Sequence, residues 1–149
     1  MAVTIHVEWG QHAIRNHSEA DIFIIIDILS FSTCIDIALS QGGIVFPYLY
    51  KQIGNHKKLS QVFAQEHNAI LASARSHQEL SLSPGSLQNM KAGTRLVLPS
   101  PNGATLSLST GSRPTLCASL RNTKAIVQWL HRQDFSFVQL VAAGERWPD

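Results

Sequence analysis

The sequence predicts an α/β protein in which a mostly parallel β-sheet carries helices on both faces. Two observations lead to this fold class. A short run rich in β-branched residues, Ile22 to Ile26, is followed at once by a segment with helical periodicity that begins at Phe31. The same order of strand, polar turn and helix recurs from Arg95 and again from Thr115. Strands that alternate with helices pair in parallel through right-handed crossovers, so their carboxyl ends should meet at one edge.

Length and composition indicate one domain. A chain of 149 residues with 44% hydrophobic residues can bury one substantial core, so a single domain over residues 1–149 is expected. The net charge of +2 comes from scattered Lys and Arg, which argues against nucleic acid as a partner. No apolar run approaches the roughly 20 residues of a membrane span, and the N-terminus does not resemble a signal peptide. We therefore expect a cytoplasmic protein without a membrane partner.

The first third of the chain holds the clearest elements. Apolar and polar residues alternate from Val3 to Trp9, which predicts a half-buried edge strand. The polar segment 10–20 is predicted to be a connection. Ile22 to Ile26 is predicted to be a fully buried strand. In the helix that follows, apolar positions 31, 34, 35, 38 and 39 share one face, with Ser30 or Ser32 placed to cap it and Gly42-Gly43 to end it.

The middle third is less regular. Ile44 to Phe46, before Pro47, predicts a second short buried strand. Asn55 is placed to cap a helix that continues to about His67, and 69–72 is another strand candidate. The stretch 73–93 is rich in Ser, Gln and Gly, which predicts an active-site or surface loop with at most a short helix.

The last third repeats the opening order of elements. A strand at 95–99 leads to Asn102, placed to cap a short helix, and a strand at 115–119 leads to Asn122, placed to cap another. A final strand at 135–143 ends in Gly144-Glu145-Arg146. The two cysteines, Cys34 and Cys117, are predicted to be small buried side chains.

Polar residues follow the predicted strands and mark the candidate site. Each alone could be a helix cap or a solvated side chain, but four such turns at the carboxyl edge of a parallel sheet indicate a binding crevice. The candidate residues are Asp27, Ser30, Ser32, Thr33, Ser100, Asn102, Ser119, Asn122, Glu145 and Arg146.

The residue types in these turns favour phosphate chemistry. Glycine-rich phosphate loops, an HExxH helix and a GxSxG elbow are absent from the sequence, and no histidine pair has metal-ligand spacing followed by a further ligand group. A zinc site is therefore not expected. Two carboxylates, several hydroxyls and amides and one arginine suit Mg²⁺ and a phosphate group, so phosphate-ester hydrolysis is the reaction class that fits best.

Four sequence blocks carry a family resemblance. IIIDILSFSTCIDIALSQGG, LVLPSPNGATLS, ASLRNTKAIVQWL and VQLVAAGERWPD, in this order, resemble the motif blocks of the ComB family, the magnesium-dependent 2-phosphosulfolactate phosphatases and their bacterial relatives. The resemblance spans roughly residues 20–149. It implies a three-layer α/β/α sandwich with a mostly parallel sheet, and Mg²⁺-dependent hydrolysis of a phosphate monoester on a small acidic substrate.

Carried over by position, the resemblance nominates particular roles. Asp27, Glu145 and Arg146 would be catalytic. Of these, Asp27 and Glu145 would hold Mg²⁺, while Arg146 and the amides near Asn102-Gly103 would bind phosphate. The remaining phosphate- or substrate-binding candidates are Ser30, Ser32, Thr33, Ser100, Ser119 and Asn122. The chain departs from the family pattern at Ser30, where many members carry arginine, and at 73–75, where they carry Gly-Glu-Arg. The substrate therefore stays open.

The resemblance also bears on length. Family chains continue well beyond the Gly-Glu-Arg turn, so we expect a member shortened at its C-terminus. An active phosphatase is one reading. A catalytically inactive remnant, or half of a split enzyme that retains an anion-binding pocket, is the alternative. A homo-oligomer, or a partner that supplies the missing segment, would be compatible with either reading.

Overall fold

The computed structural model describes residues 3–50, 56–73 and 79–144, and its strands form two parallel sheets. Sheet A has the order β1 (Thr4–Trp9), β7 (Phe137–Ala142), β2 (Ile22–Ile26), β6 (Thr115–Cys117). Sheet B has the order β3 (Ile44–Leu49), β5 (Arg95–Ser100), β4 (Ile70–Leu71). All pairings between these strands are parallel. The α/β class is confirmed, but the chain leaves sheet A after β2 and returns to it only at β6, so the single sheet that we expected is divided.

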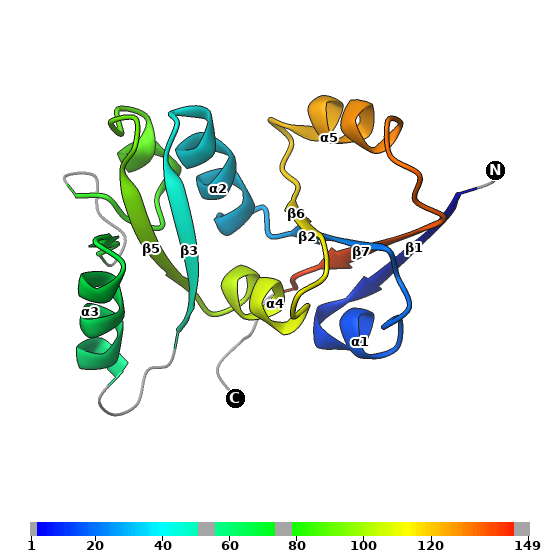
Figure 1. Ribbon diagram of the computed structural model, residues 1–149, viewed down its shortest axis with the longest axis horizontal. Helices are drawn as coiled ribbons and strands as arrows, with labels where there is room; N and C mark the ends of the chain where they lie inside the picture. The colour runs from blue at the N-terminus through cyan, green and yellow to red at the C-terminus, as the bar shows by residue number, and fades with distance from the viewer. Residues whose placement is uncertain (1–2, 51–55, 74–78, 145–149) are drawn as a thin grey trace.

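Helices cover both faces of each sheet, as predicted (Figure 1). One face of sheet A carries α1 (Gly10–Arg15) and α4 (Gly103–Ser109), and the other carries α5 (Thr123–Leu130). Sheet B lies between α3 (His56–Glu66) and α2 (Phe31–Ser40). Helix α4 contacts the cores of both sheets, because Ala104 packs in the core of sheet B and Leu106 packs in the core of sheet A.

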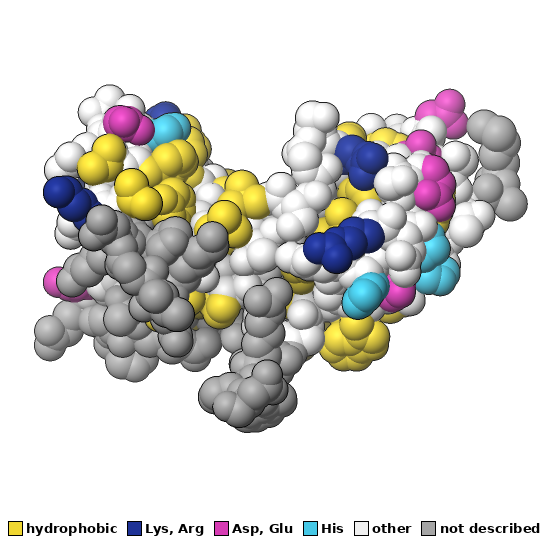
Figure 2. Space-filling view, turned by 90° about the horizontal axis from the view of Figure 1, so that it is seen from below, with side chains coloured by type: hydrophobic (Ala, Val, Ile, Leu, Met, Phe, Trp, Pro, Cys, Tyr) yellow, Lys and Arg dark blue, Asp and Glu magenta, His cyan; other side chains and the backbone are white. Residues whose placement is uncertain are grey.

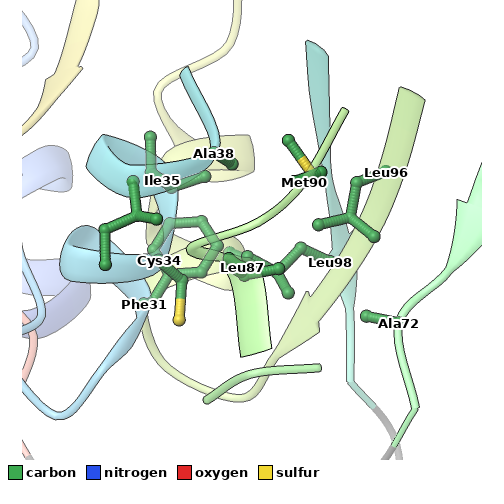
Figure 3. Packing of buried hydrophobic residues seen from close by; sticks show 11 residues of the cluster. Phe31, Cys34, Ile35, Ala38, Ala72, Leu87, Met90, Leu96 and Leu98 are labelled. Atoms are coloured by element: carbon green, nitrogen blue, oxygen red, sulfur yellow. The ribbon is translucent and has the colours of Figure 1, made fainter. Parts of the chain in front are cut away.

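The core of sheet B is built by α2, β5 and the loop before β5 (Figure 3). Phe31 and Cys34 of α2 are fully buried against Leu98 of β5. The loop contributes Leu87, from the 3₁₀ helix η1 (Pro84–Leu87), and Met90, which are 0% and 5% exposed. The prediction of a loop with at most a short helix is therefore confirmed for 79–93, but its expected position at the surface is wrong for the buried residues Leu87 and Met90.

The connection from β2 to α2 matches the sequence prediction in extent but not in its capping. Strand β2 has the predicted bounds, and Gly42, at φ +76°, ends α2 in the left-handed conformation that glycine tolerates. Ser30 occupies the N-cap position without a side-chain capping bond, because its hydroxyl donates to the carbonyl of Leu82. Buried Ser32 is likewise engaged elsewhere, as described below.

Three further expectations are corrected. The segment after β1 begins with the short helix α1, which the sequence does not signal because only Ala13 and Ile14 are buried in it. Strand β3 continues through Pro47, which its position at a sheet edge permits. Strand β1 is an edge strand as predicted, but its apolar face is open: Ile5 is 64% exposed. The predicted cap Asn55 lies outside the described residues.

Helix α5 lies over sheet A without closing on it. No residue of α5 is fully buried, and a cavity of about 340 Å³ remains between the helix and apolar side chains such as Ile24 and Leu140. Among the described residues, no helix has both the length and the apolar character needed to cross a membrane.

Candidate functional site

The carboxylate of Asp27 is fixed at the carboxyl end of β2 by the turn that follows β5. Its Oδ2 accepts a 2.8 Å hydrogen bond from the backbone N–H of Gly103, and Asp27 is 9% exposed. A Cβ atom at position 103 would lie 2.7 Å from Oδ2 and 2.3 Å from the ring of Phe31. Only glycine therefore allows the α4 backbone to approach Asp27 this closely, which explains the Asn-Gly pair in the sequence.

Ser32 shapes the turn that carries Asp27. Its hydroxyl donates to the carbonyl of Ile25 at 3.1 Å and accepts from the N–H of Asp27 at 2.9 Å. The N–H of Ser32 donates in turn to the carbonyl of Asp27 at 2.9 Å. Because the side chain of Ser32 is fully buried, these bonds fix the backbone of the turn that carries Asp27.

Asn102 connects the end of a third strand, β7, to the junction between Asp27 and Gly103. Its side-chain Nδ2 donates to the carbonyl of Gly144 at 3.3 Å, which joins the turn after β5 to the turn after β7. Asn102 occupies the N-cap position of α4 but makes no side-chain capping bond, so the predicted capping role is wrong. The turns after β2, β5 and β7 meet here, as the convergence of carboxyl ends predicts.

A pocket of about 210 Å³ opens beside this junction. Asp27 and Gly144 line it together with Trp9, Ile28 and Leu29. The sequence motifs did not indicate that Trp9 lines the pocket. Its position follows from pairing, since β1 runs parallel to β7 and Trp9 lies opposite Ala142 at the same edge. The pocket thus combines one carboxylate with an apolar wall at the carboxyl ends of β1, β2 and β7.

Ser119 and Asn122 form a closed turn of their own. Oδ1 of Asn122 accepts from the N–H of Ser119 at 2.8 Å, and its Nδ2 donates to the carbonyl of Cys117 at 3.0 Å. Asn122 therefore makes no side-chain capping bond to α5, contrary to the sequence prediction. Ser119 borders the cavity under α5, and neither residue lines the pocket of Asp27.

The remaining candidates lie around the junction without lining the pocket. Thr33 is half-buried in the first turn of α2, and Ser100 is buried at the end of β5. Ser30 contacts the loop before η1 through the bond to Leu82. Glu145 and Arg146 lie outside the described residues.

A comparison with known protein families identifies the family of the chain. The family model for 2-phosphosulpholactate phosphatase matches residues 10–147, nearly the whole chain. The chain belongs to the 2-phosphosulpholactate phosphatase family. The membership confirms the resemblance drawn from the four sequence blocks and supports a phosphatase-like function. No curated protein matches the chain.

The thiol of Cys117 is poorly suited to act as a thiolate nucleophile. Burial raises the pKa of the Cys117 thiol to about 11, and the negative charge of Asp27 acts in the same direction. A hydrogen bond with Ser107 opposes the shift but does not cancel it. At neutral pH the thiol is therefore protonated. The prediction that both cysteines are buried is confirmed for Cys34, whereas Cys117 is only partly buried.

The donor atoms at the pocket fit Mg²⁺ better than zinc. Asp27 is the one carboxylate among the described residues that line the pocket. Mg²⁺ commonly takes one or two protein carboxylates and completes its shell with water and substrate phosphate oxygens. Zinc prefers imidazole and thiolate ligands, and the described lining offers neither. An oxygen-only site of this kind would serve an ion that is shared with a phosphate group.

Proposed function

We propose that this chain hydrolyses the phosphate monoester of a small acidic substrate in the pocket at Asp27, with Mg²⁺ as cofactor. The observation that carries the proposal is the Asp27 carboxylate, which is held by Gly103 at the edge of a pocket and lies within the residues that match a phosphatase family. The substrate class would be that of 2-phosphosulpholactate, a phosphate ester that also carries further negative charge.

The overall reaction is the transfer of a phosphoryl group to water. A water oxygen bonds to phosphorus, the bond between phosphorus and the ester oxygen breaks, and the products are an alcohol and inorganic phosphate. Mg²⁺ bound at Asp27 would neutralise charge on the phosphoryl oxygens. Bringing an anionic substrate beside a carboxylate is otherwise unfavourable, because like charges at short distance repel.

Asp27 and Glu145 are the residues that we propose hold the metal, and Arg146 the residue that binds phosphate. Gly144 lines the pocket, and Glu145 and Arg146 follow it directly in the sequence. The N–H of Gly103 has a different role from the one first expected. It donates to Asp27, so it positions the carboxylate rather than the phosphate.

The apolar wall has a role in this proposal as well. Trp9, Ile28 and Leu29 border the pocket beside Asp27. When a substrate covers such a wall, water leaves and electrostatic contacts with the phosphate become stronger. We propose that this wall receives the carbon skeleton of the substrate.

The test is phosphate release from a panel of small phosphate esters, including phosphosulfolactate and phospholactate, with Mg²⁺ or with EDTA. We expect release only with Mg²⁺, and at least a roughly 100-fold loss in Asp27→Asn, the scale for disturbing a metal site at the reacting group. Asp134→Asn is the matched control, because Asp134 is an exposed carboxylate outside the pocket. No release from folded wild-type protein would contradict the proposal and would favour an inactive member that only binds anions.

A further inference from the structure

Two histidines and a glutamate meet on the edge strand of sheet A, away from the pocket of Asp27. His6 and Glu8 are two residues apart on β1, so their side chains project from the same face. His17, in the connection between α1 and β2, packs against them: its ring centroid lies 4.2 Å from that of His6. One ligand atom from each of the three residues lies within 4.8 Å of the other two. Figure 2 shows histidine and acidic side chains together at the end of the molecule that holds β1 and α1.

The two imidazole rings are oriented by neighbours outside the cluster. Nδ1 of His6 lies 3.2 Å from Oε1 of Gln139, whose side chain is fully buried in β7. Nδ1 of His17 lies 3.6 Å from Oε1 of Glu19. In protein metal sites, a ligating histidine commonly donates its second ring N–H to such a carbonyl or carboxylate oxygen, which fixes the tautomer. In this arrangement Nε2 of each ring is the atom left for a cation.

Glu8 is held in a comparable way. Its Oε1 accepts a 3.3 Å hydrogen bond from Nδ2 of Asn16. Its Oε2 is buried, accepts no hydrogen bond from the described residues, and lies 3.4 Å from Nε2 of His17. A buried carboxylate oxygen without a hydrogen bond is costly, and a coordinated cation would remove that cost.

We propose that His6, Glu8 and His17 form a binding site for a divalent transition metal of the zinc type. Two imidazole nitrogens and one carboxylate oxygen are a ligand set that zinc uses, with a fourth position open to water. Imidazole ligands also favour zinc over Mg²⁺, which prefers oxygen alone. The site is independent of the proposed phosphatase pocket, since none of its three residues lines that pocket.

A metal at this position would strengthen the edge of sheet A. It would join β1 to the connection between α1 and β2 through bonds that the unfolded chain cannot preorganise. Binding to the folded state alone raises the temperature of unfolding as the metal concentration increases. Zinc should therefore stabilise the protein as well as bind to it.

The experiment is a calorimetric titration of Zn²⁺ into the untagged, metal-free full chain, compared with Glu8→Gln and His17→Gln. We expect one saturable site per chain and a loss of affinity of about 100-fold or more in each variant. Glu19→Gln, which changes only the partner of His17, should lose about 10-fold. His131→Gln is the matched control, since His131 is an exposed histidine at the end of α5 and should bind as wild type does.

A second measurement makes the result independent of how the variants fold. Co²⁺ bound to wild type should give the visible absorption of a four- or five-coordinate ion, and Zn²⁺ should abolish it while excess Mg²⁺ should not. Absence of a saturable zinc site, or an unchanged affinity in folded Glu8→Gln and His17→Gln, would overturn the proposal. A cobalt spectrum typical of the hexa-aquo ion would overturn it too. Loss of phosphatase activity in Asp27→Asn with intact zinc binding would separate the two sites.

Discussion

The backbone N–H of Gly103 donates to Oδ2 of Asp27 at 2.8 Å, although the two residues are 76 positions apart in the sequence. The bond connects the end of β2 in sheet A with the turn after β5 in sheet B. Asp27, the residue proposed to bind the metal, is thus held by a bond that links the two sheets.

Replacing Gly103 by alanine should destabilise the protein. The added Cβ would lie 2.3 Å from the Phe31 ring and 2.7 Å from Oδ2 of Asp27, and Phe31 is fully buried and cannot move away. Overpacking of this kind costs about 1–3 kcal/mol or more in the free energy of unfolding, measured by urea denaturation. Gly85→Ala is the control, since a Cβ there meets nothing within 4 Å. Equal stabilities of the two variants would show that α4 can shift away from Asp27.

Ser32→Ala should lower stability because it removes two hydrogen bonds that a buried hydroxyl makes with the backbone. The carbonyl of Ile25 and the N–H of Asp27 both bond to the buried hydroxyl. A hydrogen bond of this kind contributes about 0.5–1.5 kcal/mol, so the loss of two should lower the free energy of unfolding by about 1–3 kcal/mol. Ser109→Ala removes an exposed hydroxyl that bonds within α4 and should change stability by less than about 0.5 kcal/mol. An undiminished stability of Ser32→Ala would mean that the turn can be held without this side chain.

Asp21 should contribute to stability in a pH-dependent way. The backbone N–H groups of Phe137 and Ser136, and the Ser136 hydroxyl, donate to Oδ2 of Asp21 and lower the pKa of this carboxyl below its usual value of 3.8. A lowered pKa in the folded state means that the contribution is complete above pH 3.8 and is lost as pH falls through the lowered pKa. Asp21→Asn should therefore lower the melting temperature at neutral pH, and the difference from wild type should shrink in strong acid. A difference that is the same at both pH values would argue against a charge effect.

Cys117 should react slowly with alkylating reagents in the folded protein. With a pKa raised to about 11, its thiolate fraction near pH 8 is about 100-fold below that of an ordinary thiol. We expect the rate of alkylation by iodoacetamide, followed by mass spectrometry of the Cys117 peptide, to keep rising with pH beyond 9 while the fold is intact. The same peptide in denaturant serves as the control and should react at the ordinary rate. Rapid modification of folded protein at neutral pH would contradict the proposed burial.

Much of the local structure could be predicted from the sequence. The β-branched run 22–26 forms β2, the apolar positions from Phe31 form α2, and Gly42 ends that helix, because these features depend on neighbours within a few residues. The family was also recognisable, since its motif blocks occur in order along the chain. The location of Asp27 at the carboxyl end of β2 could also be predicted, because this residue directly follows a buried strand.

Other features depended on residues that are distant in the sequence. The Ser32 hydroxyl and the Asn102 amide, which were expected to cap helices, make other bonds. Backbone groups of the turn after β2 and of Gly144 lie within their reach. Trp9 joined the pocket through the pairing of β1 with β7.

The cluster of His6, Glu8 and His17 shows most clearly that contacts between distant residues could not be predicted from the sequence. His6 and Glu8 share a strand face, but His17 reaches them only because the chain turns back after α1. The sequence by itself determined most of the strands and helices, the α/β class and the family, since local periodicity and motif order depend on residues that are close in the sequence. Only the tertiary structure decided the two sheets, the partner of Asp27 and the histidine cluster, because close contacts between distant residues depend on how the elements pack.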